Sequence, residues 1–600
     1  MKDNTNNSSS VSDDSHNAED HGSDDEEAEP LVLEVDGSTT TSSTRGYALK
    51  RRPLVQFLGI YVLILLPMAG IGLSTVLLVG HATTSQKKNS STTTSASASA
   101  TEPPATMNDN KKPVTLSTGV AHWDAAFLVA MAEVSENIMA NGNFMAGAGW
   151  TQLWTRDTSY AVQLGLALLY PQVSQVTLEA CTQPHDDKDG HQHTLDSNIL
   201  GTTTWLQDVC GHFNGWPYLS DAIVGAQGAW SLFLATGNTT FLEWAYNMTR
   251  STLTWAELEV YDNTTGLFRG CSSFMESNSA YPTEYRFSGP KVGATKALST
   301  NVLYYNGYTL AAQMEQVLHP GKKDKTNSQQ LQTKAKHLRK AIRSRLWLED
   351  HGYYAYYEEA NGTLHPKMEG LGESLLLLAP NLESNQTRIR RLFESVHRTP
   401  HGIPCLWPQF DLHREKPKDY ASYYHNGRIW PFVQGYWALA AARHKQVDVF
   451  QQELDSLVGL AMNSAPMETD TTGTQDQPTF AEFYQLDGTY MWKRRRQLWS
   501  SAGYLGMILH GLFGMELQVD GILFRPVVPA QSTNTTSTTE EQVMTLENLR
   551  YRRALLTLHI TGHGTVVDTF AINGKPQDKP FLAADAVGHQ KIEMVLKQDG

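Results

Sequence analysis

The feature that most constrains the fold is a long succession of segments, between residues 123 and 513, in which apolar residues recur every three or four positions. In the first segment Phe127, Met131, Val134 and Ile138 have this spacing, which places them on one face of a helix. Glycine-rich and aromatic-rich stretches separate the segments, so a ring of helical hairpins with a site at one end of the ring accounts for the pattern. The predicted helices are 123–139, 159–169, 221–236, 239–258, 300–318, 327–346, 372–378, 429–443, 446–462 and 501–513.

The character of the chain changes after Leu517. Four runs there alternate or are rich in β-formers, with Gly and Pro between them: 522–524, 555–560, 566–572 and 591–596. Such runs predict strands. The expected fold class is therefore mainly α, with a helical domain at 118–516 and a small C-terminal β-sandwich domain at 517–600.

Three parts of different composition precede the helical domain. Residues 1–53 are expected to form a disordered tail, because they begin with a stretch rich in Ser, Asp, Glu and Asn and poor in large apolar side chains. Residues 54–80 carry no charged side chain and are long enough to cross a bilayer, which takes about 20 apolar residues. Residues 81–117, mostly Ser, Thr and Ala, predict a flexible stalk.

The charges around residues 54–80 predict an orientation. Arg45, Lys50, Arg51 and Arg52 precede the segment, which favours a cytoplasmic N-terminus and a single-pass type II anchor. A cleaved signal peptide would be shorter and would start nearer to Met1. A buried core helix is the other alternative, but both flanks have disordered composition.

We therefore expect the residues after the anchor to be luminal, in the secretory pathway, or extracellular. Sequons for N-glycosylation give this placement moderate support, at Asn238, Asn247, Asn263, Asn361, Asn385 and Asn534. Four cysteines, Cys181, Cys210, Cys271 and Cys405, could form two disulfides there, and three pairings are open. The formal net charge of -14 argues against a nucleic-acid partner.

Four short stretches combine carboxylates with aromatic or arginine side chains. They are Trp154–Asp157, Ser272–Asn278 around Glu276, His425–Pro431 with Arg428 and Trp430, and Phe480–Tyr484 around Glu482. A sugar ring requires such a site, because carboxylates transfer protons, indole faces stack on the ring and charged groups bind its hydroxyls. The combination predicts a glycoside hydrolase that acts on an oligosaccharide or another glycoside. No group of His and Cys has the spacing of a metal site.

In their order and spacing these stretches resemble the six-hairpin glycosidases, the (α/α)6-barrel superfamily that includes glucoamylase, trehalase and processing α-glucosidase. The resemblance covers about Trp123–Met515, and the β-rich tail is similar to that of several bacterial members. It implies a toroid of six helical hairpins and an exo-acting hydrolase without a cofactor. Further matching stretches are Trp216-Pro217 with Asp221, Lys296–Tyr305, Glu369–Glu373 and Gln497–Gly506.

The resemblance also implies two catalytic residues. Glu276 stands at the place of the general acid, where many relatives have Asp, and its neighbours Phe274 and Met275 could raise its pKa by desolvation. Glu482 matches the general base, which deprotonates a water on the opposite face of the sugar. An acid and a base on opposite sides of one bond imply inversion.

The substrate-binding residues follow in the same way. The resemblance implies that Arg156 donates to sugar hydroxyls and that Asp157 accepts from them, with Asp221 and Arg428 as further binding residues. Trp154, Trp216, Trp430 and Trp499 are expected to be sugar platforms or walls of the pocket. Glu369 and Glu373 are expected to have structural or supporting roles.

Other functions remain open at the level of the sequence. Phosphorylases and uronate lyases use similar helical toroids, although a phosphorylase would lack a base carboxylate and a lyase would favour Tyr or His as the base. The Glu in place of Asp at position 276 also leaves open a carbohydrate-binding ectodomain without activity.

Overall fold

The computed structural model describes residues 112–184, 203–208, 221–286, 288–321, 326–412, 424–466, 477–530 and 543–597. The expected tail at 1–53, the expected anchor at 54–80 and most of the expected stalk lie outside these residues, as does the sequon at Asn534. Within the described ranges, no helix has both the length and the apolar character that crossing a membrane requires.

Six helices form a closed inner ring. Each packs against the next one along the chain, and the last packs against the first. π-helical turns extend the first and last members: η1 (Val162–Leu166), followed by α3 (Ala167–Leu169), and η6 (Met507–Leu512). The ring consists of α2 (Thr155–Ala161), α5 (Gly225–Thr236), α8 (Leu298–Leu318), α10 (Gly370–Leu378), α12 (Pro431–Arg443) and α14 (Leu498–Gly506).

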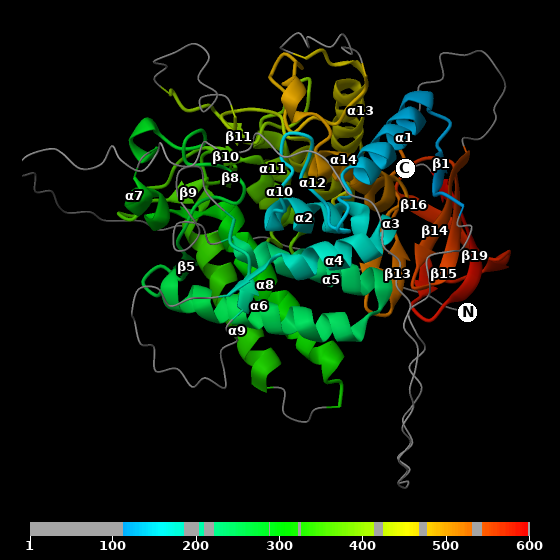
Figure 1. Ribbon diagram of the computed structural model, residues 1–600, viewed down its shortest axis with the longest axis horizontal. Helices are drawn as coiled ribbons and strands as arrows, with labels where there is room; N and C mark the ends of the chain where they lie inside the picture. Colours follow the sequence, from blue (N-terminus) through cyan, green and yellow to red (C-terminus); the bar gives the residue numbers. More distant parts are fainter. Residues whose placement is uncertain are drawn as a thin grey trace, which may run out of the picture. The chain divides into compact units, whose positions relative to one another are not determined.

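A second set of helices alternates with the ring along the chain and covers it from outside. In α6, Phe241, Leu242 and Ala245 are buried against the ring while Glu243 and Asn247 face solvent, as expected of an amphipathic outer helix. The outer helices are α1 (Ala121–Glu136), α4 (Pro171–Ala180), α6 (Thr239–Glu259), α9 (Thr326–Arg345), α11 (Gln386–Ser395) and α13 (Val447–Asn463). Figure 1 shows α6 and α9 beside α8.

The ten predicted helices are all present, with ends that differ by a few residues, but α4, α11 and the short α7 (Gly289–Ala294) were not predicted. We expected the helix at 159–169 to stop at Pro171. It does stop before Pro171, but α4 begins there, because proline is well tolerated at the first helical position. Helix α11 starts after Asn385, whose side chain caps the helix by accepting from the backbone N–H groups of Thr387 and Arg388.

Short segments join the helices at the end where the ring helices begin. They include the 3-10 turns η2 (Ala222–Val224), η3 (Thr283–Tyr285) and η5 (Trp492–Arg494). The strands among them are β2 (Thr182–Pro184), β3 (Thr203–Trp205), β4 (Tyr261–Asp262), β5 (Leu267–Phe268), β6 (Lys296–Ala297), β7 (Trp347–Leu348), β8 (Tyr353–Tyr354), β9 (Tyr357–Glu358), β10 (Met368–Glu369) and β11 (Leu406–Trp407).

The C-terminal region forms two sheets. A three-stranded sheet contains β12 (Met515–Gln518), β13 (Gly521–Phe524) and β18 (Phe581–Ala583), and a six-stranded sheet has the order β1-β14-β15-β19-β16-β17. Phe524 of the smaller sheet lies 5.6 Å from Phe570 of the larger one, ring centroid to ring centroid. The strands of the larger sheet are β1 (Thr115–Ser117), β14 (Val543–Tyr551), β15 (Arg553–Thr561), β16 (Val566–Ile572), β17 (Lys575–Pro576) and β19 (Val587–Lys597).

The four predicted strands lie within β13, β15, β16 and β19. Two boundaries differ from the prediction. The first C-terminal strand starts at Met515 rather than after Leu517, and the end of the expected stalk is β1, which pairs with β14. Residues 115–117 therefore belong to the sheet domain rather than to a free linker.

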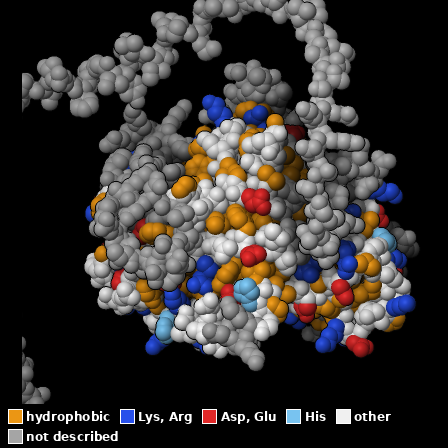
Figure 2. Space-filling model, turned by 60° about the horizontal axis from the view of Figure 1, so that its bottom comes forward, with side chains coloured by type: hydrophobic (Ala, Val, Ile, Leu, Met, Phe, Trp, Pro, Cys, Tyr) orange, Lys and Arg blue, Asp and Glu red, His pale blue; other side chains and the backbone are white. Residues whose placement is uncertain are grey.

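The described surface is mixed in character. On the face that Figure 2 shows, basic and acidic side chains are scattered among hydrophobic ones, without a large area of a single charge. The cysteines Cys181, Cys271 and Cys405 are buried and form no disulfide with one another. The expected pairs among these three are thus wrong, and Cys210 lies outside the described residues.

Candidate active site

The predicted site residues gather at the end of the ring where its helices begin. Trp154, Glu369, Trp430 and Gln497 each immediately precede a ring helix, and all four have extended backbone. The first N–H groups of a helix lack partners within it and carry a partial positive charge. This end of the ring therefore favours carboxylates and other acceptors.

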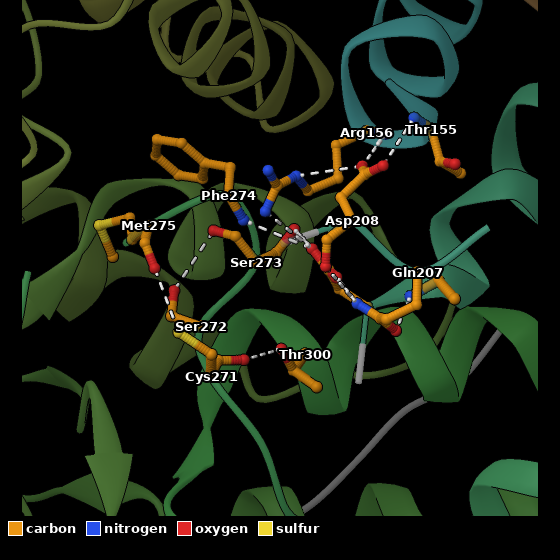
Figure 3. Close-up of polar contacts among 12 residues, drawn as sticks. Thr155, Arg156, Gln207, Asp208, Cys271, Ser272, Ser273, Phe274, Met275 and Thr300 are labelled. Atoms are coloured by element: carbon orange, nitrogen blue, oxygen red, sulfur yellow. Dashed lines mark hydrogen bonds and ion pairs between the residues drawn. The ribbon is translucent and has the colours of Figure 1, made fainter. Parts of the chain in front are cut away.

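Arg156 is the centre of a buried charge cluster. Its Nε lies 3.3 Å from Oδ2 of Asp208, and its Nη1 lies 3.9 Å from Oδ2 of Asp221. Asp208 also accepts hydrogen bonds from the backbone N–H groups of Thr155 (3.1 Å) and Arg156 (2.9 Å), as Figure 3 shows. Burial alone would lower the pKa of Arg156, but the surrounding carboxylates outweigh burial and raise it. Arg156 is therefore a permanent cation beneath the site.

Asp157 and Asp221 have different surroundings. One oxygen of Asp157 accepts from Nε2 of Gln497 (2.9 Å), and burial raises the pKa of Asp157 well above its ordinary value. Asp221 accepts from the side chains of Gln207 (2.7 Å) and Ser273 (3.1 Å) and from the backbone N–H of Phe274 (3.4 Å). All these partners are protein groups, so Asp221 holds the loop before Glu276 in place. Its expected role in substrate binding has no support from these contacts.

The loop that carries Glu276 is fixed by its backbone, while the acid itself is left open. Phe274 has a φ of 58°, which is uncommon for a non-glycine residue. The backbone N–H of Glu276 donates to Nδ1 of His425 (3.3 Å), which also lies 2.7 Å from Oγ of Ser279. The half-buried carboxyl group of Glu276 has no hydrogen bond to another described residue. Burial raises its pKa, although Arg156 and Arg494 oppose this effect.

Glu482 is held by three side chains from distant parts of the chain. Its Oε1 accepts from Nε1 of Trp150 (2.7 Å) and from the hydroxyl of Tyr424, and its Oε2 lies 3.5 Å from Nε of Arg494. The guanidinium of Arg494 also lies 4.1 Å from the centre of the Trp150 ring. Burial raises the pKa of Glu482 to about 7, and Arg494, Tyr424 and Trp150 oppose this rise. These partners fix the carboxylate in one orientation.

The two glutamates are electrostatically coupled but have different environments. The negative charge of Glu276 contributes to the raised pKa of Glu482. Donors and a cation surround Glu482 and oppose the rise of its pKa, whereas the carboxyl of Glu276 lacks such donors among the described residues. Such a pair can divide the roles of base and acid between two carboxyl groups.

The tryptophans form walls more than platforms. Trp430 is 1% exposed and stacks on His425, with ring centroids 4.7 Å apart and an interplanar angle of 11°. Trp499 is 4% exposed and stacks on Phe432 at 4.1 Å. Because other rings cover them, neither can offer a full indole face to a sugar. Trp154 is half-buried, and Arg156 lies 5.7 Å from its ring. Trp216 lies outside the described residues.

Three more candidates contact residues outside the Arg156 cluster. The carbonyl of Arg428 accepts from the backbone N–H of Cys405 (2.8 Å), and the charge of Arg428 lowers the pKa of Asp487, so none of these contacts joins it to the Arg156 cluster. Glu369 is buried and accepts from Ser272 and from the backbone N–H of Ser299. Glu373 accepts from the backbone N–H of Tyr354 (2.7 Å). The last two contacts agree with structural roles.

Several residues of the site were not among the predicted catalytic and binding residues: Trp150, Asp208, Tyr424 and Gln497, together with Arg494, which the sequence offered only as one of three neighbouring arginines that could pair with Glu482. Three of them stand in or beside recognised stretches, since Trp150 precedes Trp154, Tyr424 precedes His425 and Gln497 opens the last matched stretch. Asp208 carries no such signal, and only the fold brings it to Arg156. Among the described residues, no group of His, Cys, Asp and Glu could hold a metal ion.

Comparison with known proteins places the chain in a family. A sequence profile of the mannosylglycerate hydrolase MGH1-like glycoside hydrolase domain matches residues 152–500, which is more than half of the chain. The chain therefore belongs to this family, and it is a glycoside hydrolase of the six-hairpin type. No curated protein sequence matches it.

Comparison with solved structures gives matches at low sequence identity. A sialidase superposes with a TM-score of 0.56 at 13% identity, over 79% of this chain and 42% of the sialidase. A GH78 family rhamnosidase of Bacillus sp. GL1 gives 0.47 at 10% identity, over 81% and 44%. A GH63 mannosylglycerate hydrolase from Thermus thermophilus, in complex with Tris, gives 0.47 at 12% identity, over 64% and 100%. The chain thus spans less than half the length of the first two proteins.

Proposed function

We propose that this glycoside hydrolase is exo-acting and inverts the anomeric configuration, with Glu276 as the general acid and Glu482 as the general base. The contrast between the two carboxyl groups carries the proposal. Glu482 is fixed by Trp150, Tyr424 and Arg494, as a base that must aim at one water molecule requires. Burial raises the pKa of both groups, but the carboxyl group of Glu276 has no hydrogen bond to a described residue, so it is free to donate its proton to a leaving oxygen.

In the proposed mechanism the sugar lies over Arg156 and Asp157. The proton of Glu276 moves to the glycosidic oxygen while the bond between this oxygen and the anomeric carbon breaks. A water on the other face gives its proton to Glu482, and its oxygen forms the new bond to the same carbon. One displacement inverts the configuration. Asp221 and His425 act only by holding the loop of Glu276.

The decisive experiment follows the first product by proton NMR during hydrolysis. Inversion predicts that the product anomer is opposite to the anomer of the substrate, whereas release of the same anomer would refute the mechanism. The family profile carries the name of a mannosylglycerate hydrolase, so mannosylglycerate belongs in the substrate screen beside aryl glycosides and oligosaccharides. Binding of these compounds without any turnover would favour a carbohydrate-binding ectodomain instead.

We also propose that residues 54–80 anchor the protein as a type II membrane glycoprotein with a luminal or extracellular hydrolase domain. Four sequon asparagines are exposed, Asn247, Asn263, Asn361 and Asn385, so they are accessible for glycosylation. Treatment with an endoglycosidase should then lower the apparent mass of the expressed protein. Protease added to sealed microsomes should remove only the N-terminal tail. Digestion of the hydrolase domain would show that the protein has the opposite orientation.

A further inference from the structure

A cavity with a mainly apolar wall and a few polar side chains lies at the opposite end of the ring, where the ring helices end and the C-terminal sheets pack against them. Its volume is about 590 Å³, within the range of roughly 300–1,000 Å³ that small-molecule pockets occupy. One wall comes from the ring and includes Gln163, Gln227 and Asn306, and the other comes from the sheet domain and includes Phe524 and Val567. Neither Glu276 nor Glu482 lines it.

Two buried amides in this wall lack protein partners. Gln227 on α5 is 3% exposed and Asn306 on α8 is 9% exposed. Nε2 of Gln227 and Oδ1 of Asn306 are buried and have no hydrogen bond within the described structure. An unmatched buried donor or acceptor is costly, so a polar partner, whether water or a guest in the cavity, would stabilise these side chains.

A third amide is already oriented. Oε1 of Gln163 accepts from the hydroxyl of Tyr436 (2.6 Å), which leaves the Nε2 group of Gln163 as a donor. The cavity therefore offers donors from Gln163 and Gln227 and an acceptor from Asn306. Hydroxyl groups match this mixture, because each of them both donates and accepts.

The charged side chains of the wall are Arg443, Lys445, Arg525 and Glu516, and two of the three cations share the one carboxylate. Glu516 lies 3.8 Å from Arg443 and 3.1 Å from Arg525, so its carboxylate is already paired. Trp230 follows Gln227 by three positions on α5, which places both on one face of the helix. An indole beside amides is suited to the apolar face of a sugar ring.

The backbone around the cavity is also unusual. The two π-helical turns, η1 and η6, contact each other, and each contributes a lining residue, Gly165 and His510. Gly165 has a φ of 135°, and a Cβ there would lie 3.0 Å from Cδ1 of Leu509. Single π-helical turns are rare and frequently mark functional sites.

We propose that this cavity is a second binding site, for a hydroxyl-rich molecule of monosaccharide size. The ring and the sheet domain both contact the guest, so its binding stabilises their packing and raises the Tm by mass action.

The test uses crystals of the protein carrying Glu482→Gln, soaked with D-glucose, D-mannose or glycerol. Density for one of these probes against Gln227 and Asn306 is the expected result. Water alone in the cavity with all three probes would overturn the proposal. Because the result is read from the position of the probe, it does not depend on whether Glu276 and Glu482 hydrolyse anything.

A second test measures the affinity for the probe in solution and compares matched variants. In the Glu482→Gln protein, the double change Gln227→Leu and Asn306→Leu should weaken calorimetric binding of the same probe by about tenfold or more. Gln227→Glu keeps the volume and replaces the donor NH2 group by an acceptor oxygen, so it serves if the double variant does not fold. Unchanged affinity in a folded variant would refute the site. If the double variant has a higher Tm and the probe binds to neither protein, the cavity is a dry or water-filled void and the proposal is wrong.

Discussion

At the scale of single residues, the proposed acid Glu276 and the proposed base Glu482 should respond differently to substitution, because one donates a proton and the other accepts one. Each role contributes roughly 100- to 10,000-fold, so Glu276→Gln and Glu482→Gln should both lose most of their turnover. An activated aryl leaving group needs little protonation, so Glu276→Gln should retain more activity on it than on an unactivated glycoside. Glu482→Gln should be equally poor on both. Steady-state kinetics on the two substrates, with circular dichroism as the folding control, measures this contrast.

The pH profiles of the same variants add a second contrast. Glu276→Gln should lose the alkaline limb of kcat/KM, and Glu482→Gln should lose the acidic limb, because these limbs report the acid and the base of the free enzyme. Wild-type turnover of Glu276→Gln on an unactivated glycoside would show that Glu276 is not the acid.

Arg494 sets the pH at which the base works. Its guanidinium lowers the pKa of Glu482 against the effect of burial, and that pKa is about 7. Without this charge the pKa rises further, so Arg494→Met should move the acidic limb of kcat/KM upward by about 1–3 pH units. Arg494→Lys keeps the charge and is the matched control, with a limb close to the wild type. If the limb of Arg494→Met does not move, Arg494 does not tune the base.

The sequence contains the catalytic candidates more clearly than their partners. Arg156, Asp157, Glu276 and Glu482 stand in local patterns that a single sequence displays. Their partners depend on closure of the ring, since Trp150 and Glu482, which share a hydrogen bond, are 332 positions apart. Burial of Trp430 and Trp499 is likewise a property of packing, which a local pattern does not encode.

At the scale of elements, two ring helices approach closely through paired glycines. A Cβ on Gly435 of α12 would lie 2.8 Å from Cα of Gly503 on α14. Gly435→Ala should therefore force the helices apart and destabilise the protein by about 1–3 kcal/mol. Gly459→Ala on α13 is the control, since no atom lies within 4 Å of its added Cβ. It should stabilise by about 0.4–1 kcal/mol through the unfolded chain. Thermal unfolding compares the two, and equal Tm values would contradict the close approach.

A buried acid in the packing of α12 and α13 makes stability depend on pH. Oε2 of Glu453 accepts from Nε2 of Gln434 (3.2 Å) and from the backbone N–H of Ile403 (3.2 Å), and burial raises its pKa from 4.5 to about 7. Between these values the folded state keeps a proton that the unfolded state has lost, so this group's contribution is full below pH 4.5 and declines as pH rises toward 7. The loss is on the order of 3 kcal/mol.

Glu453→Gln should not show this decline, because an amide does not titrate. The unfolding free energy of the variant relative to the wild type should increase from about pH 5 to about pH 7, as measured by denaturant unfolding at each pH. A constant difference across this range would mean that Glu453 is ionised in the folded protein.

The periodicity of apolar residues predicted the long helices because each buries one face, as in α6. It missed α11 because only Ile389, Leu392 and Phe393 are buried there, in a helix rich in arginine. It missed β14 because that strand follows residues 531–542, a polar stretch that hid its start.

At the scale of the whole molecule, the ring presents two different ends. The helices begin at the carboxylate site, and they end against the sheets, as the positions of β14 and β15 in Figure 1 show. The link between ring and sheets is made by backbone contacts as well as by side chains. The backbone N–H of Arg552 donates to the carbonyl of Ala235 at the end of α5 (3.1 Å), and that of Val527 donates to Gly511 (3.1 Å).

The sheet domain should therefore be required for a soluble hydrolase. A chain from Asp109 to Met515 would expose the apolar residues Leu168, Leu234 and Leu439 that line the far end of the ring, and it would leave β1 without its partner β14. Exposed apolar patches of this kind cause aggregation, so the truncated chain should lose soluble yield and activity. A chain from Asp109 to Lys597 keeps every described strand and should behave like the longer protein. Size-exclusion chromatography and hydrolysis assays compare the two, and a soluble, fully active Asp109–Met515 chain would show that the sheets are an independent module.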